Sequence, residues 1–551
     1  MDMTGLRTGG KILVDALVAQ GCDRIFTVPG ESFLQVLDAL HDVPAIDLVV
    51  CRHESGAAFM ADADGRMTGR PGIAFVTRGP GATNASIGVH VARQDSAPMI
   101  LFVGDVARDA RDREGFQEVD LAAMFAPLAK WAARIDDAAR IPEYIARAFA
   151  TAISGRPGPV VLALPEDMLS DEVEAVDRPR VDRPDQPPAS AAVAQTLDML
   201  RAAHNPIAIV GGADWDKAAG AAFSSFAQAW GIPVAAAFRR QDSIPNDHPV
   251  WAGNLGYGPN PKLVQRIKSA DLVLVVGPRL GEATTDGYSL ITPDHPGQTL
   301  IHVHPDTSEL NSAYRADLAI CSGMWEFADA LASAKAPEAP STAAAEAHAE
   351  WLDWSTAAPR EGATLDLGQC ILAMGQALPW DTIVCNGAGN FSAWVHRYWR
   401  YGLHVSQLAP TAGAMGYGVP AGIAAALRAP ERQVVVFAGD GDFLMTGQEL
   451  ATAMRHNAKL LFVVVDNKSY GTIRAHQERR YPARISGTDL TNPDFAALAR
   501  AYGLHAETVR TTAEFAPALD RARAAGIALL HLKTDIEQIS PAATVSGLRG
   551  K

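Results

Sequence analysis

Apolar and polar positions alternate along this chain in one pattern that repeats from end to end. Short β-branched or apolar runs, each long enough for one strand, precede stretches in which apolar residues recur with helical spacing. Strands that are apolar throughout are typical of parallel sheets covered on both faces, and the intervening helices supply the crossovers. The pattern therefore predicts an α/β protein made of doubly wound parallel sheets.

Two segments rich in proline and charge interrupt this alternation. Residues 171–190 read DEVEAVDRPRVDRPDQPPAS, and residues 335–347 read KAPEAPSTAAAEA. A helix or a strand ladder would not persist through the first, and we expect both to be linkers. The 551 residues would then form three domains, over residues 1–170, 190–334 and 346–551.

Charge and cysteine usage narrow the class of protein. The net charge of −14 disfavours nucleic acid and anionic membranes as partners, because an acidic surface releases no counterions from a polyanion. No apolar stretch is long enough to cross a bilayer, and the first helix carries Lys11 and Asp15, unlike a signal peptide. The cysteines are scattered without a zinc or disulfide pattern. We expect a cytoplasmic protein that acts on small molecules.

Two strand ends carry the most specific chemistry in the chain. One apolar strand runs into the turn Gly439-Asp440-Gly441-Asp442, and the apolar strand after the next helix ends before Asn467. Neighbouring parallel strands would bring these ends together, where open α/β sheets hold ligands. Asp440 and Asn467 offer the hard oxygen ligands that Mg²⁺ prefers, and glycines let phosphates approach the backbone. Each turn alone is common turn chemistry, but together they predict Mg²⁺ holding a diphosphate.

This segment resembles the diphosphate-binding signature of thiamine-diphosphate enzymes, and the match to acetolactate synthases continues as GQELATAMRHNAKLLFVVVDN and TNPDFAALARAYG. The resemblance implies that the Asp440 and Asn467 side chains and the Ser469 carbonyl bind Mg²⁺. It also implies further cofactor contacts at Gly389, Asn390, Gly439, Gly441, Asp442, Gly471 and Thr472. Phe391 stands where the family has a histidine, so this contact differs.

Thiamine diphosphate reacts only after a carboxyl group, hydrogen-bonded to its pyrimidine, drives the imino tautomer that removes the C2 proton. The segment CRHESGAAFMADADGRMTGRPGIAFVTRGPGATN is similar to the pyrimidine-binding segment of acetolactate synthases, with Glu54 at the position of the family glutamate. Such a carboxyl works best shielded from water. The alternative is a solvated glutamate at a helix start. The match favours catalysis, with the turn at residues 79–84 leading into a helix at the active centre.

The segment TAGAMGYG, from Thr411, resembles the family segment that holds the cofactor bent. There Met415 would wedge beneath the two rings, and the Gly413 and Met415 backbones would bond the pyrimidine; the alternative for Met415 is core filler. In this family the pyrimidine domain of one subunit faces the diphosphate domain of another. The resemblance therefore implies a homodimer as the minimum, with tetramers common among relatives.

The substrate pocket matches the family less closely. Phe116 and Gln117 resemble residues that line the substrate chamber, with Lys130 near its entrance, and the alternative is an amphipathic surface. His476 stands where acetolactate synthases have a tryptophan over the acceptor pocket, so the second substrate can differ.

The middle domain departs from flavin-binding members of the family. After the strand that ends in Gly277, only Arg279 matches their arginine-rich motif, so FAD is disfavoured although it stays open. His302 and His304 alternate on a strand, and we interpret them as packing residues rather than ligands.

Together these features predict a carboligase or decarboxylase of a 2-oxo acid, with pyruvate as the leading donor and ylide and enamine intermediates. A decarboxylase without ligation and an acyl-CoA lyase of the same family are alternatives. A non-catalytic regulatory paralogue is a remote one, because it would not need Glu54, Met415, Asp440 and Asn467 together. The acceptor, the product chirality and a regulatory subunit stay open.

Overall fold

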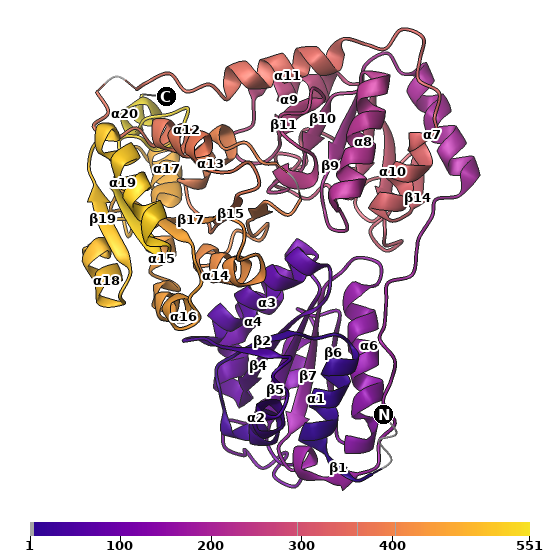
Figure 1. The fold of residues 1–551 in the computed structure, drawn as a ribbon. Coiled ribbons are helices and arrows are strands. Elements are labelled where there is room, and N and C mark those ends of the chain that lie inside the picture. The colour runs from indigo at the N-terminus through magenta and orange to yellow at the C-terminus, as the bar shows by residue number, and fades with distance from the viewer. Residues whose placement is uncertain (1–4, 295, 361, 403, 551) are drawn as a thin grey trace. The chain divides into compact units, whose positions relative to one another are not determined.

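The computed structural model of the chain describes residues 5–294, 296–360, 362–402 and 404–550 (Figure 1). The chain forms two compact units. The first takes in the chain as far as Pro184 together with Ala412–Pro430 and Thr446–Ala458; the second takes in Asp185–Thr411, Glu431–Met445 and the chain from Lys459 onward. Two short C-terminal segments therefore belong with the N-terminal sheet, which the positions of the linkers did not predict.

A parallel sheet in the order β3-β2-β4-β5-β7-β6 forms the centre of the first unit. Its strands are β2 (Arg24–Thr27), β3 (Asp47–Val50), β4 (Gly72–Thr77), β5 (Met99–Asp105), β6 (Trp131–Arg134) and β7 (Pro159–Pro165), and a short pair, β1 (Arg7–Thr8) and β8 (Glu172–Val173), lies beside it. The helices of this unit are α1 (Gly9–Ala19), α2 (Leu34–His41), α3 (Glu54–Thr68), α4 (Arg78–Asp95), α5 (Leu121–Phe125), α6 (Ile141–Ile153), α14 (Gly418–Arg428) and α16 (Leu450–Arg455).

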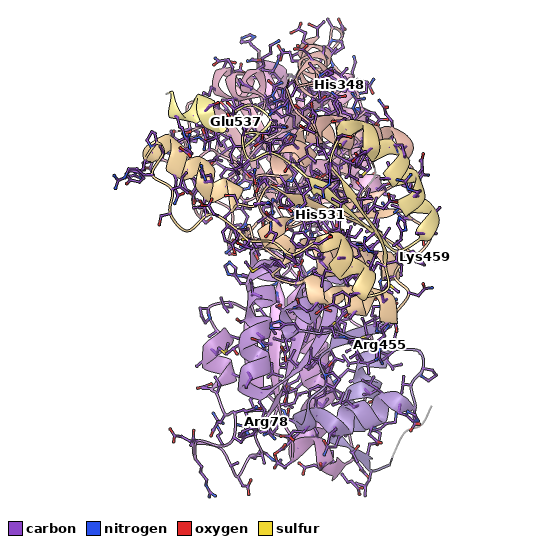
Figure 2. All side chains as sticks on the ribbon, turned by 90° about the vertical axis from the view of Figure 1, so that its left-hand side faces the viewer. Arg78, His348, Arg455, Lys459, His531 and Glu537 are labelled. Carbon is purple, nitrogen blue, oxygen red and sulfur yellow. The ribbon has the colours of Figure 1, made fainter. Side chains whose placement is uncertain are left out.

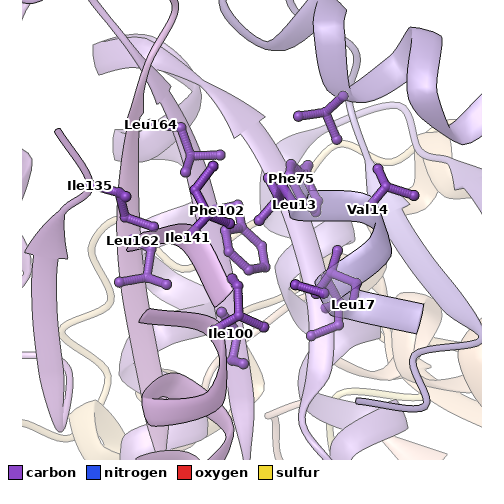
Figure 3. Close-up of a cluster of buried hydrophobic side chains, with 14 of the residues drawn as sticks. Leu13, Val14, Leu17, Phe75, Ile100, Phe102, Ile135, Ile141, Leu162 and Leu164 are labelled. Carbon is purple, nitrogen blue, oxygen red and sulfur yellow. The ribbon is translucent and has the colours of Figure 1, made fainter. Parts of the chain in front are cut away.

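Side chains from both layers fill the core of this unit (Figure 3). Leu13 and Leu17 of α1 belong to the same buried cluster as Phe75 and Phe102, whose rings stack with centroids 4.5 Å apart. All seven residues of β5 are buried, as expected of a strand covered on both faces.

The central sheet belongs to the second unit and has the order β11-β10-β9-β12-β13-β14. Its strands are β9 (Pro206–Val210), β10 (Val234–Ala236), β11 (Trp251–Asn254), β12 (Leu272–Val276), β13 (Thr299–His304) and β14 (Leu318–Cys321), all parallel. Its helices are α7 (Ser190–Ala202), α8 (Lys217–Trp230), α9 (Pro261–Ser269), α10 (Met324–Ala332) and α11 (Ala343–Trp354). This is the strand order of a dinucleotide-binding fold, with its switch point between β9 and β12.

The C-terminal sheet of the second unit has the order β16-β15-β17-β18-β20-β19. Its parallel strands are β15 (Ile383–Asn386), β16 (Gln407–Leu408), β17 (Val434–Gly439), β18 (Leu461–Asp466), β19 (His505–Val509) and β20 (Ala528–Lys533). Its helices are α12 (Leu367–Ala377), α13 (Ser392–Tyr398), α15 (Asp440–Phe443), α17 (Gly471–Arg480), α18 (Phe495–Ala501), α19 (Thr512–Ala525) and α20 (Val545–Arg549). Counted along the chain, its strand order equals that of the first sheet.

The predicted fold class is confirmed: three parallel sheets are each covered by helices. One local expectation was wrong, because residues 79–84 lie inside α4 and not in a turn before it. Pro80 is accommodated there because the first helical turn leaves its N–H groups free. Among the helices of the described chain, none has the length and apolar character needed to cross a membrane.

Candidate active site

The carboxyl ends of β17 and β18 carry the predicted metal ligands. Gly439 lies opposite Val465 in the register of the two strands, so Asp440 follows at the level of Asp466. The Asp440 carboxylate is 3% exposed; its Oδ1 accepts the Gly441 N–H at 3.0 Å, and its Oδ2 accepts a bond from Asn492 Nδ2 at 2.8 Å. Two neighbouring strand ends thus bring the predicted turn next to Asp466 and Asn467.

One amide group links the two acids of this edge. Asn492 Nδ2 also donates to Asp466 Oδ1 at 2.8 Å, while Asn492 Oδ1 is buried and has no hydrogen-bond partner among the described residues. Asp466 further accepts bonds from His531 Nε2, labelled in Figure 2, at 2.8 Å and from the Lys533 ammonium.

The pKa values of the two carboxyl groups are shifted in opposite directions. Burial raises the pKa of Asp440, and the nearby Asp466 charge adds to this effect. Burial also opposes ionisation of Asp466, but hydrogen bonds from His531, Lys533 and Asn492 outweigh it and lower the pKa of Asp466 below its usual value. Asp466 therefore stays ionised next to Asp440.

Asn467 and Ser469 lie in the turn that follows β18. Asn467 Oδ1 accepts the Ser469 N–H at 3.0 Å, and the Ser469 hydroxyl donates to the Thr488 carbonyl at 2.9 Å. Lys468 between them has a left-handed backbone with φ of 57°. This tight turn connects β18 to α17, so that Asn467 and the Ser469 carbonyl lie near the end of the strand.

The other predicted diphosphate contacts gather around the same edge. Asp442 Oδ1 accepts the Ala388 N–H at 3.1 Å, and a Cβ on Gly471 would lie 2.3 Å from Asn390 Oδ1. The buried Phe391 ring packs against Gly389 and Gly439, where a Cβ would lie 2.8 Å and 3.0 Å from it. These contacts bring Gly389, Asn390, Gly439, Asp442 and Gly471 together, and Phe391 fills space where the family has a histidine.

The outward face of α17 carries the predicted acceptor residue. His476 is exposed one helical turn after Thr472, and the neighbouring Ile473 is 54% exposed.

The predicted pyrimidine residues belong to the first unit. Glu54 is the first residue of α3, and its Oε2 accepts a bond from Asn84 Nδ2 at 2.9 Å. A Cβ on Gly81 would lie 3.6 Å from Glu54 Oε1, in ordinary contact. The starts of α3 and α4 thus place an amide donor directly against the Glu54 carboxyl.

The loop that carries Phe116 and Gln117 lies at the start of α4. The Gln117 carbonyl accepts the Gly79 N–H at 3.0 Å, and Gln117 has a left-handed backbone with φ of 64°. A left-handed backbone at a residue with a side chain is a strained state that tends to occur at functional sites. Phe116 is 71% exposed, whereas the Lys130 ammonium binds the Ser154 carbonyl at 2.7 Å, beyond the end of α6.

The segment around Met415 packs on α3. The Tyr417 hydroxyl donates to Asp62 Oδ2 at 2.7 Å, and Arg428 binds Asp64 at 2.7 Å, so the loop and α14 are held to this helix from both ends. Gly413 has a φ of 68°, which suits glycine, and Met415 is only partly buried.

Several contacts of these sites were not predicted from the sequence, namely those of Asn492, Asp466 and His531. All three are polar side chains in segments that otherwise read as ordinary strand or loop. The side chains of Asp466 and His531 and the Oδ1 atom of Asn492 are buried, and burial of a polar group is not visible in a single sequence.

Comparison with known families finds three matching domains along the chain. The chain matches the thiamine pyrophosphate enzyme N-terminal TPP binding domain over residues 7–124, the central domain over 193–331 and the C-terminal TPP binding domain over 387–532. An acetolactate synthase large subunit from Parasynechococcus marenigrum (strain WH8102) is 32% identical, over 90% of this chain and 82% of the relative.

The chain belongs to the thiamine pyrophosphate enzymes. Two further similar proteins are the acetolactate synthase isozyme 2 large subunit of Escherichia coli (strain K12), 30% identical over 97% of both chains, and the large subunit of Corynebacterium glutamicum, 30% identical over 94% of this chain and 84% of the relative. This thiamine pyrophosphate enzyme therefore carries, in one chain, both cofactor-binding domains and the central domain of its family.

Proposed function

We propose that this thiamine pyrophosphate enzyme is a carboligase that decarboxylates a 2-oxo acid, with pyruvate as donor, and joins the product to a second carbonyl. Acetolactate is the simplest product. One observation carries the proposal. The same chain holds Asp440 and Asn467 at the adjacent ends of β17 and β18, and it holds Glu54 hydrogen-bonded to Asn84. Full-length similarity to acetolactate synthase large subunits supports the choice of substrate.

The residues at the β17 and β18 ends fit a magnesium diphosphate. Asp440, Asn467 and the Ser469 carbonyl would supply hard oxygen ligands. The buried Asn492 Oδ1 without a described partner, beside Asp440, is the kind of orphan that a bound ion or its water would satisfy. Thiamine diphosphate, when bound there, supplies the carbon nucleophile and the electron sink for decarboxylation.

Glu54 would hold and move the activating proton. Its carboxyl, oriented by Asn84, would share a proton with the pyrimidine nitrogen. Met415 would support the bent cofactor, and the Gly413 backbone would form a hydrogen bond with the pyrimidine. Asp440 would stay ionised on the metal, because a bound cation favours the carboxylate over the acid. Phe116 and Gln117 would line the donor pocket, and His476 would contact the acceptor.

A complete site would need two copies of the chain. Glu54 and Asp440 belong to separate compact units, and family members join these halves across subunits. Apolar side chains near the proposed cofactor residues support this arrangement, since Phe116 in the first unit and Met445 and Ile473 in the second are 71%, 47% and 54% exposed. We propose a homodimer as the minimum, with a tetramer to be tested by sedimentation velocity.

Close packing at the switch point of the central sheet argues against a bound flavin dinucleotide. A Cβ on Gly212 would lie 2.1 Å from the Gly277 carbonyl oxygen, and a Cβ on Gly277 would lie 2.2 Å from the Gly211 carbonyl oxygen. Trp215 Nε1 donates to that Gly211 carbonyl at 2.8 Å, and His302 Nε2 donates to the Pro278 carbonyl at 3.0 Å. The two loops are thus packed against each other where a dinucleotide would enter. We propose turnover without FAD.

Product analysis tests the function. Purified enzyme is supplied with thiamine diphosphate, Mg²⁺ and pyruvate but no FAD, and CO₂, acetolactate and acetaldehyde are followed together. Acetolactate with CO₂ supports the carboligase, and acetaldehyde with CO₂ replaces it by a decarboxylase. Cofactor binding without CO₂ release would refute pyruvate as donor and direct attention to the pocket around His476.

A further inference from the structure

Glu449 is a buried carboxylate with no described basic side chain bonded to it. It ends the short 3₁₀ helix η5 (Gly447–Glu449) and is 0% exposed. Burial raises the pKa of Glu449, and hydrogen bonds from its neighbours oppose the shift. A buried charge is costly unless it is fully hydrogen-bonded, so an acid at this position calls for a specific role.

The bonds of Glu449 go to the backbone directly before Glu54. The Arg52 N–H donates to Oε1 at 3.1 Å and to Oε2 at 3.2 Å, and the His53 N–H donates to Oε1 at 2.9 Å. The Thr452 hydroxyl donates to Oε2 from the same segment as Glu449. Glu449 therefore binds, from another segment of the chain, the N–H groups of the N-cap residue of α3 and of the residue before it.

The start of α3 is shaped to receive this carboxylate. A Cβ on Gly56 would lie 2.4 Å from Glu449 Oε1, so any side chain there would displace the acid. His53 also fixes this backbone, since its Nδ1 accepts the Ser55 N–H at 3.2 Å. The position of the Glu54 backbone is thus set by two independent groups.

The segment that carries Glu449 also holds the Met415 loop. The Thr446 hydroxyl donates to the Gly416 carbonyl at 2.6 Å, three residues before Glu449. One short segment of the first unit is therefore bonded both to the residue after Met415 and to the residue before Glu54.

We infer that Glu449 is a positioning residue, which holds the Glu54 carboxyl in place. This inference rests on the proposed function, which gives Glu54 the activating proton of the cofactor. Glu449 does not touch the cofactor in this role. It acts through the Arg52 and His53 backbone, and a shift of Glu54 by a fraction of an ångström would misalign the shared proton.

The test compares Glu449→Ala and Glu449→Gln with the unchanged enzyme. Hydrogen–deuterium exchange at C2 of bound thiamine diphosphate reports activation without turnover, and amide exchange of residues 51–56 reports the backbone without cofactor. We expect Glu449→Ala to slow C2 exchange by about 10- to 100-fold and to speed amide exchange, with cofactor affinity within about threefold. Glu449→Gln keeps one acceptor oxygen and should recover part of the loss.

Asp366→Ala provides a matched control. Asp366 is also a buried carboxylate that accepts helix N–H groups, those of Gly368 at 2.9 Å and Gln369 at 3.3 Å, at the start of α12. Its loss should lower thermal stability as Glu449→Ala does, yet leave C2 exchange within about twofold.

The outcomes separate this inference from the function on which it rests. If Glu449→Ala, or Glu449→Gln should the alanine variant not fold, exchanges C2 at the rate of the unchanged enzyme, the positioning role is refuted. Glu54→Gln is measured in parallel: slowed exchange there with normal exchange in the Glu449 variants refutes positioning alone. Normal exchange in Glu54→Gln refutes the activating role of Glu54 and with it the proposed function.

Discussion

Asn492→Ala tests whether the amide between the two acids supports the metal site. The substitution removes two bonds of 2.8 Å, one to Asp440 and one to Asp466. The Asn492 bond lowers the pKa of Asp440, and without it burial and the Asp466 charge would raise that pKa further. A metal ligand must be ionised, so protons would compete more strongly with Mg²⁺.

The magnitude follows from the type of bond lost. A hydrogen bond to a charged group contributes about 1.5–3 kcal/mol. Asp440 keeps its bond from Gly441, so we expect the lower end of this range, which raises the pKa of Asp440 from about 6 by about one unit and weakens Mg²⁺ binding about threefold near pH 6.5. Because both forms of the enzyme hold an ionised Asp440 well above this pKa, the loss should disappear at pH 8.5.

The assay is a Mg²⁺ titration of enzyme saturated with thiamine diphosphate, followed by tryptophan fluorescence at both pH values. Asn260→Ala is the control, because Asn260 is a buried asparagine that caps α9 and donates to the Glu350 carbonyl, in the central domain. Mg²⁺ binding by Asn492→Ala that equals the control at both pH values would refute the role of this amide.

Three further predictions concern the chemistry, the pH dependence and the central domain. Glu54→Gln should keep thiamine diphosphate affinity within about threefold and lower kcat by about 10²- to 10⁴-fold; a kcat near that of the unchanged enzyme would contradict its role as proton carrier. Burial lowers the pKa of His396 to about 3. Between pH 3 and 6.5, therefore, His396 is protonated in the unfolded chain but not in the folded one. The free energy of unfolding should fall by up to about 1.4 kcal/mol per pH unit as the pH drops below 6.5. His396→Gln should flatten this dependence in urea titrations at pH 5.0 and 7.5, and an unchanged slope would count against it. Purified enzyme should show no flavin absorbance near 450 nm, and added FAD should leave the rate unchanged; a rate that rises with FAD would mean that the loops at Gly211 and Gly277 open.

The sequence predicts the parallel sheets and the closeness of the segments after β17 and β18 for a physical reason. Strand periodicity and the crossover between β17 and β18 are local, and they already bring the residues after Gly439 level with those after Val465. The partners of those residues are not local. Asn492 reaches Asp440 from a loop 52 positions along the chain, and Glu449 reaches His53 across 396 positions. Such contacts depend on tertiary packing that periodicity does not encode.

The first and last sheets share one strand order but not one chemistry. At the switch point of the first sheet, a Cβ on Gly30 would lie 2.3 Å from the Thr77 Cβ, so the ends of β2 and β4 pack closely and leave little room for a ligand. At the corresponding place in the last sheet, the segment after β17 carries Asp440 and Asp442. Asp442 accepts the Ala388 N–H from the segment after β15, and Asp440 accepts the Gly441 N–H and the Asn492 amide. The first sheet instead offers Glu54 after the neighbouring strand β3. The topology of a sheet thus fixes where a ligand can lie. The side chains at the strand ends decide which chemical groups of a ligand can bind there.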